Sequence, residues 1–173
     1  MWKALLHLVA VILVALSGPA AAQTDTVGSW MVSTQSDTAL YAVTVNDSGA
    51  LLGQFCYPEQ GSCMWLLGMS TGCQEGDKYP VLLYSDRGAQ SVEIYCDGKL
   101  ESGLYRYAFT DFDAMQNHVK DSTRIGFAVP LRADQFRVVR FTLDGATRAI
   151  QAMRDAAENK PTRARHGTRD QVL

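Results

Sequence analysis

Residues 40–57 have the sequence LYAVTVNDSGALLGQFCY, in which two runs of apolar, β-branched and aromatic residues flank a polar turn. The turn consists of Asn46, Asp47, Ser48 and Gly49. These residue types favour turns because Gly tolerates positive φ, and Asn, Asp and Ser hydrogen-bond to nearby backbone. The segment therefore predicts an antiparallel β-hairpin, with strands over 40–45 and 51–57.

Further short runs of the same kind follow, separated by residues that favour turns. They cover residues 63–67, 79–84, 91–96, 104–109, 123–129 and 135–143. Regularly spaced short strands joined by turns are typical of antiparallel sheets. We therefore predict a single, mainly β domain over residues 30–159, built as an antiparallel β-sandwich or an open barrel.

Residues 111–120 have the features of a short helix. Acidic residues occupy the first turn and Lys120 the last, which suits the helix dipole. An apolar face would be formed by Phe112, Met115 and Val119. We expect this helix to cover an open end of the sheet.

A second, C-terminal helix is predicted over residues 144–159, with Asp144 as its N-cap. Spacing near 3.6 residues would form an apolar seam of Ala146, Ile150, Met153 and Ala157. We expect this seam to pack on the sheet. The side chains expected to face water are Arg148, Arg154, Asp155 and Glu158.

The N-terminus has the pattern of a signal peptide over residues 1–22. Lys3 precedes an apolar run over 4–16, and the small residues Ala20 and Ala22 precede the expected cleavage site. The run is shorter than the roughly 20 residues that a membrane-spanning helix needs. We predict a periplasmic or secreted protein with no membrane span after cleavage, and a flexible leader over residues 23–29.

The charged residues are unevenly distributed. The whole chain has 16 basic and 18 acidic residues, but residues 160–173 are polar and basic, without hydrophobic periodicity. We predict a disordered basic tail there and an acidic folded body. Nucleic acid is not expected as a partner, because its binding depends on clustered Lys and Arg.

The four cysteines, Cys56, Cys63, Cys73 and Cys96, predict two disulfides in an exported chain. Three pairings are possible. Hairpin geometry favours Cys56–Cys63 across the turn 58–61, which leaves Cys73 for Cys96. No metal site is predicted, since the spacings lack the paired C-x-x-C motifs of a four-thiolate zinc site.

No motif of a known catalytic or cofactor-binding class is present, so we predict no cofactor. His118 is predicted to lie on a solvated helix face, because Asp111 and Asp113 are too distant along a helix to contact it directly. An alternative function is a small exported hydrolase that uses carboxylates converging in space, such as Asp111, Asp113 or Glu93.

The aromatic residues either build the core or line a ligand groove, since aromatic rings bind sugars and extended peptides by stacking. The candidate ligand-contacting aromatics are Tyr57, Trp65 and Tyr84. Alternation along strands favours a core position for Trp65. For Tyr57 and Tyr84, which lie beside turns, the preference for the core is weaker.

The order of segments along the chain also resembles that of a known protein family. The chain has a signal peptide, an opening Trp30-Met31-Val32, a cysteine-containing β-rich middle, the segment IGFAVPL at 125–131 and the segment FTLDGA at 141–146. This layout resembles the invasion-associated locus B family of small exported proteins of Gram-negative bacteria. The resemblance implies a β-sandwich in the periplasm or at the cell surface. Our leading hypothesis is a non-enzymatic module that binds a protein or a small extracytoplasmic ligand.

Overall fold

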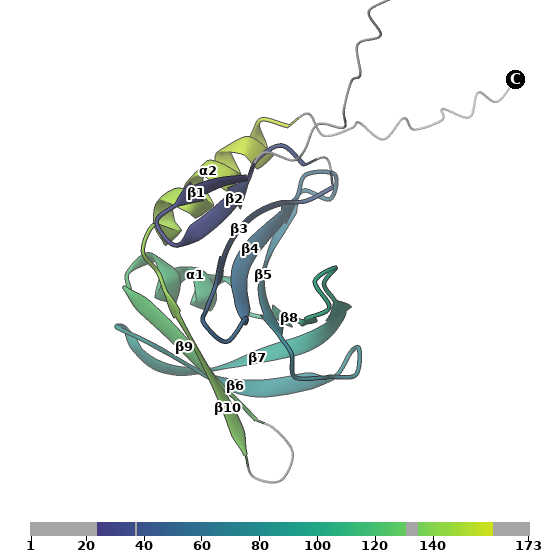
Figure 1. Cartoon of the computed structure of the whole chain (residues 1–173), viewed down its shortest axis with the longest axis vertical. Helices are drawn as coiled ribbons and strands as arrows, with labels where there is room; N and C mark the ends of the chain where they lie inside the picture. The colour runs from purple at the N-terminus through teal and green to yellow at the C-terminus, as the bar shows by residue number, and fades with distance from the viewer. Residues whose placement is uncertain (1–23, 37, 131–134, 161–173) are drawn as a thin grey trace, which may run out of the picture.

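The computed structural model describes residues 24–36, 38–130 and 135–160 (Figure 1). The predicted signal peptide and residues 161–173 of the predicted tail lie outside this part of the chain. The elements are β1 (Thr24–Val27), β2 (Trp30–Ser33), β3 (Leu40–Val45), β4 (Leu51–Tyr57), β5 (Ser62–Met69), β6 (Lys78–Ser85), β7 (Gly88–Lys99), β8 (Tyr105–Phe109), α1 (Phe112–Lys120), β9 (Arg124–Pro130), β10 (Phe136–Thr142) and α2 (Ala146–Glu158).

The described strands form one antiparallel sheet in the order β1-β2-β3-β4-β5-β8-β7-β6-β9-β10. The predicted mainly β, antiparallel fold is therefore confirmed, and the strands form one continuous open sheet. The hairpin predicted at 40–57 is β3 and β4, which pair in register from Leu40 opposite Cys56 to Val45 opposite Leu51. Neither helix in the described ranges is long and apolar enough to cross a membrane.

The core lies on the face of the sheet that the two helices cover. α2 packs on β1, β2, β3 and β4, whereas α1 contacts β5, β9 and α2 (Figure 1). The predicted seam of α2 is confirmed, because Ala146, Ile150 and Met153 are buried and Ala157 packs against the core.

Arg154 lies on the inner side of α2, and the prediction that it faces water is wrong. Its Nε donates to Gln54 Oε1 at 2.7 Å, and its Nη2 donates to Gln116 Oε1 at 2.6 Å. Gln54 is completely buried on β4. A buried amide oxygen needs a hydrogen-bond donor, and Arg154 supplies it. This polar contact joins β4, α1 and α2.

The start of the domain also differs from the prediction. Residues 24–27, expected to belong to a flexible leader, form β1 and pair with β2. The β1–β2 turn lies directly against the start of α2, where a Cβ on Gly145 would be 2.2 Å from Val27 O. Gly145 has a φ of 84° and is the N-cap of α2, without a side-chain cap, so the predicted cap at Asp144 is wrong. The Asp144 carbonyl instead accepts a hydrogen bond from Ser29 N at 3.1 Å.

Candidate functional site

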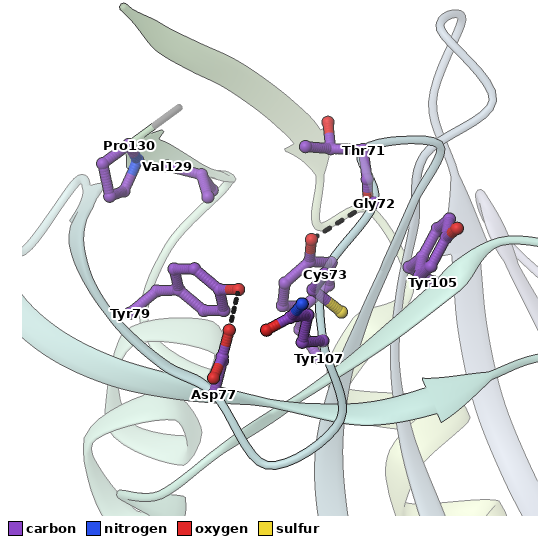
Figure 2. Close-up of a pocket in the computed structure, with 10 residues that line it drawn as sticks. Thr71, Gly72, Cys73, Asp77, Tyr79, Tyr105, Tyr107, Val129 and Pro130 are labelled. Atoms are coloured by element: carbon purple, nitrogen blue, oxygen red, sulfur yellow. Dashed lines mark hydrogen bonds between the residues drawn. The ribbon is translucent and has the colours of Figure 1, made fainter. Parts of the chain in front are cut away.

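One candidate site is a cavity of about 670 Å³ at one end of the core face. We call it the tyrosine pocket. Its lining consists of Thr71, Gly72, Cys73, Gln74 and Asp77 from the β5–β6 loop, Tyr79 from β6, Tyr105 and Tyr107 from β8, and Val129 and Pro130 from β9. Figure 2 shows Tyr79, Val129 and Pro130 on one side of the cavity and the loop with Thr71, Gly72 and Cys73 on the other.

The β5–β6 loop is held in place by covalent and backbone bonds. The disulfide Cys73–Cys96 links it to β7, which confirms the predicted pairing, as does Cys56–Cys63 at the β4–β5 hairpin. Beside the disulfide, Cys96 N donates to Asp77 O at 2.8 Å and Gly76 N donates to Cys96 O at 2.9 Å. This wall of the pocket is therefore fixed before any ligand binds.

Tyr107 anchors the floor of the pocket. Its hydroxyl donates to Thr71 O at 2.9 Å, and its ring meets the Tyr79 ring edge to face, with centroids 5.9 Å apart. Burial, together with the neighbouring phenols of Tyr79 and Tyr105, raises the pKa of Tyr107 to about 12. The hydroxyl therefore stays protonated at neutral pH and acts as a hydrogen-bond donor.

The polar groups of the pocket lie at its rim. Tyr79 donates its hydroxyl proton to Asp77 Oδ2 at 3.2 Å, and Asp77 itself is exposed. On the opposite side, Arg137 Nη1 from β10 donates to Ser70 Oγ at 3.1 Å and Thr71 Oγ1 at 3.2 Å. The pocket therefore combines an aromatic and apolar interior with one carboxylate and one guanidinium near its opening.

The three aromatics singled out from the sequence do not gather at this site. Trp65 is completely buried in the core, where no surface ligand can contact it. Tyr57 is half-buried on β4, where burial raises its pKa. Tyr84 lies on the other face of the sheet, with its ring against Gly126 and the Arg140 guanidinium 5.9 Å from the ring centroid.

The tyrosines that do gather were in the sequence but were not singled out. Tyr105 and Tyr107 are two residues apart on one strand, so their side chains share a face of the sheet. Cys96 lies opposite Tyr107 in the β7–β8 register. The predicted disulfide between Cys73 and Cys96 could therefore have indicated that the loop over residues 70–77 lies beside Tyr105 and Tyr107. Nothing local in the sequence places Tyr79 beside them.

A second, smaller cavity of about 350 Å³ lies at α1 and is lined by polar groups around His118. The prediction that His118 is solvated is wrong, since only 7% of the residue is exposed. His118 Nδ1 is 2.8 Å from Ser85 Oγ, and Nε2 is 3.2 Å from Gln90 Oε1. The amide oxygen can only accept, so Nε2 carries the proton and Nδ1 accepts the Ser85 hydroxyl proton.

These contacts belong to a cluster that ties the β6–β7 hairpin to α1 and the segment after it. We call it the latch, and it consists of Ser85, Asp86, Arg87, Gln90, His118, Asp121 and Thr123. Arg87 Nη1 is 2.7 Å from Asp121 Oδ2, and Asp86 Oδ2 accepts from Thr123 Oγ1 at 2.7 Å. The hydrogen bond from the Thr123 backbone is the main cause that lowers the pKa of Asp86.

Ser85 and His118 are paired as a nucleophile and a base would be, but the serine has another role. Its Oγ accepts from Arg87 N at 3.1 Å within the hairpin turn, and it does not line the cavity. Burial, and then the Arg87 charge, lower the pKa of His118. The arrangement favours a neutral histidine that fixes the hairpin to the helix.

The candidate carboxylates are not brought together in a dry pocket. Asp111 and Asp113 both line the smaller cavity, but both are exposed, and Asp111 Oδ1 accepts from Ala114 N at 2.8 Å as the cap of α1. Glu93 lies on β7 and pairs with Lys78 at 2.9 Å. In the described ranges, no group of three or more His, Cys, Asp or Glu side chains is placed to hold a metal ion.

Comparisons with known proteins identify the fold. No protein-family model matches the chain, and no curated protein matches its sequence. Among solved structures, the crystal structure of invasion associated protein B from Bartonella henselae matches with a TM-score of 0.57 and 16% identity. The match covers 79% of this chain and 99% of that chain. The predicted resemblance is therefore confirmed for the fold.

Proposed function

We propose that this chain is an exported binding module of the bacterial cell envelope and that its ligand occupies the tyrosine pocket. The paired cysteines support export, because disulfides persist in oxidising compartments such as the periplasm. The fold likeness to an invasion-associated bacterial protein supports the same location.

The observation that carries the proposal is the construction of the pocket. Its volume of about 670 Å³ falls within the range of roughly 300–1,000 Å³ typical of ligand sites. Such sites combine apolar and aromatic walls with a few polar groups that orient the ligand. Here Tyr79, Tyr107 and Val129 supply the walls, and the Asp77 carboxylate supplies an acceptor at the rim.

This geometry suits a flat, partly apolar group that carries a hydrogen-bond donor. The Tyr79 ring offers a stacking surface, and Asp77 can accept a hydrogen bond from a group lying on that ring. Because the disulfide and the Tyr107 hydroxyl hold the wall in place, little ordering is needed on binding. Both an aromatic peptide side chain and a sugar ring have this chemistry.

The test is an NMR titration of the oxidised protein with two small probes, N-acetyltyrosinamide and N-acetylglucosamine. We expect at least one probe to shift the backbone amide signals of Gln74, Tyr79 and Val129 in a saturable manner. The probe that binds identifies the ligand class. Saturable shifts confined to the α1 cavity, at Gln90 and Asn117, or no saturable shift at all, would contradict the proposal.

A further inference from the structure

The two edges of the sheet are unequal, and β10 has the features of a strand-docking edge. β1 is four residues long, with three exposed threonine and aspartate residues. β10 is seven residues long and exposes Phe136 at 66% and Val138 at 44%. Natural edges are usually short or charged, which prevents unwanted pairing. β1 follows that rule, whereas the first half of β10 does not.

The backbone of β10 is oriented for pairing on its open side. Asn46 Nδ2 donates to Arg140 O at 3.1 Å, so this carbonyl points away from β9. Backbone groups alternate sides along a strand, so the N–H and C=O groups of Phe136 and Val138 point to the same open side. Asn46 covers the edge at Arg140, and among the described residues no strand pairs with the open side of the stretch from Gln135 to Val139.

The open stretch is surrounded by apolar side chains on one face of the sheet. Phe136 and Val138 lie opposite Pro130 and Ala128 of β9, and Leu82 of β6 lies opposite Ala128. Leu82 is 48% exposed. Val138, Ala128 and Leu82 therefore form a row across three strands, beside which the apolar side chains of an added strand would pack.

On the other face, the same stretch adjoins the tyrosine pocket. Arg137 lies opposite Val129, which lines the pocket, and its guanidinium reaches Thr71 at the pocket rim. Alternate side chains of a strand added to β10 would point toward this rim. The edge and the pocket therefore lie close enough to bind two parts of one ligand.

We propose that the Gln135–Val139 edge of β10 binds an extended peptide segment of a partner protein by strand addition, with one aromatic side chain of that segment in the tyrosine pocket. The inference rests on the proposed function, and it selects a peptide as the ligand. Strand addition takes affinity from main-chain hydrogen bonds and specificity from pockets for alternate side chains.

An extended peptide fits this edge better than a second copy of the chain. A stable protein interface buries about 800 Å² on each partner, more than a stretch of five residues on one strand provides. Arg137 and Arg140 flank Val138 on opposite faces of β10. The peptide therefore carries acidic residues next to its apolar ones, as charge complementarity requires.

The experiment measures binding of a synthetic peptide, acetyl-EVTVYVE-amide, to the oxidised protein. The key variant is Val138→Pro, which removes an N–H on the open side and leaves the bonds to β9 intact. We expect peptide affinity to fall about tenfold or more, while the shifts caused by N-acetyltyrosinamide are unchanged. A tenfold loss corresponds to about 1.4 kcal/mol, the size of one or two hydrogen bonds.

A matched pair of substitutions controls for surface hydrophobicity. Val138 and Val45 are exposed valines on different strands, at 44% and 48%. Val138→Lys should weaken peptide binding, because a lysine at the edge opposes strand addition, and Val45→Lys should not. Equal affinity of the wild type and Val138→Pro, or equal effects of the two lysine substitutions, would overturn the edge assignment.

The two ligands test peptide binding at the β10 edge separately from binding in the tyrosine pocket. If N-acetyltyrosinamide binds but the peptide gains no affinity over it, the pocket stands and strand addition is wrong. If neither N-acetyltyrosinamide nor the peptide binds, strand addition is wrong, and the pocket proposal fails as well unless N-acetylglucosamine shifts the pocket signals. Should Val138→Pro not fold, hydrogen exchange on the wild type decides, because the bound peptide must slow exchange of the Phe136 and Val138 amides.

Discussion

The two ends of the core face use polar groups in opposite ways. In the latch, both nitrogens of His118 are bonded, Arg87 pairs with Asp121, and Asp86 accepts from Thr123. In the tyrosine pocket, hydrogen bonds fix the loop and the rim, and aromatic and apolar side chains line open space. The first end joins elements of the fold, and the second presents a preformed surface. Substitutions should therefore affect stability at the first and binding at the second.

The largest effect on stability is expected in the shared core. Ile150→Ala removes a buried side chain between α2 and the sheet and should destabilise the protein by about 2–5 kcal/mol, measured by urea unfolding. Both ends of the core face pack on this core, so the loss of stability in Ile150→Ala is the reference against which the other substitutions are compared. A loss below about 1 kcal/mol would show that α2 is not required to close the core.

Next in size is Arg154→Ala, which leaves the Gln54 oxygen without its donor and leaves the Gln116 oxygen with only the long hydrogen bond from Gln54 Nε2 at 3.4 Å. An unsatisfied buried polar group costs about 1–3 kcal/mol, and Gln54 is completely buried. Arg148→Ala is the matched control, since Arg148 is an exposed arginine of the same helix, and it should change stability by less than about 0.5 kcal/mol. Equal effects of the two substitutions would mean that the Arg154 contacts contribute nothing.

The latch should make stability depend on pH. Burial lowers the pKa of His118 from the ordinary value of 6.5, so below that pH the unfolded chain takes up a proton that the folded chain does not. Stability should therefore fall as the pH is lowered from about 7 to about 5, above the range where most carboxylates titrate. The measurement is the melting temperature across this range.

His118→Gln is the comparison for that experiment. His118 is the only histidine in the described part of the chain, so its replacement should flatten the dependence of the melting temperature on pH across this range. Probe binding in the tyrosine pocket should be unaffected at neutral pH. A variant that keeps the full pH dependence would show that other groups cause it.

Apart from the Cys73–Cys96 disulfide, which follows once Cys56 is paired with Cys63, the features that the sequence predicted correctly are local ones. The hairpin at 40–57 follows from alternation around a four-residue turn, and the Cys56–Cys63 disulfide closes the next hairpin. The seam of α2 follows from its period. Each depends on residues close together in the chain.

The features that the sequence missed depend on contacts between distant segments. The helix cap at Gly145 is determined by the β1–β2 turn, whose residues lie more than a hundred positions earlier. His118 is buried because the β6–β7 hairpin reaches α1. The tyrosine pocket likewise forms where a loop, three strands and a disulfide meet, so no single stretch of sequence contains its pattern.

The smallest effect on stability is expected in the tyrosine pocket, where the effect on binding should be largest. Tyr79→Leu keeps an apolar side chain beside Tyr107 but removes the aromatic face and the hydroxyl at Asp77. Stability should change by about 1 kcal/mol or less. Asn117→Ala, in the α1 cavity, is the matched control.

The role of the tyrosine pocket in binding is best measured by the affinity of Tyr79→Leu for whichever of N-acetyltyrosinamide and N-acetylglucosamine binds the wild type, determined by NMR titration beside Asn117→Ala. We expect binding to be lost in Tyr79→Leu and kept in Asn117→Ala, with both variants folded. Unchanged affinity in Tyr79→Leu, or loss only in Asn117→Ala, would contradict the assignment of the tyrosine pocket as the binding site.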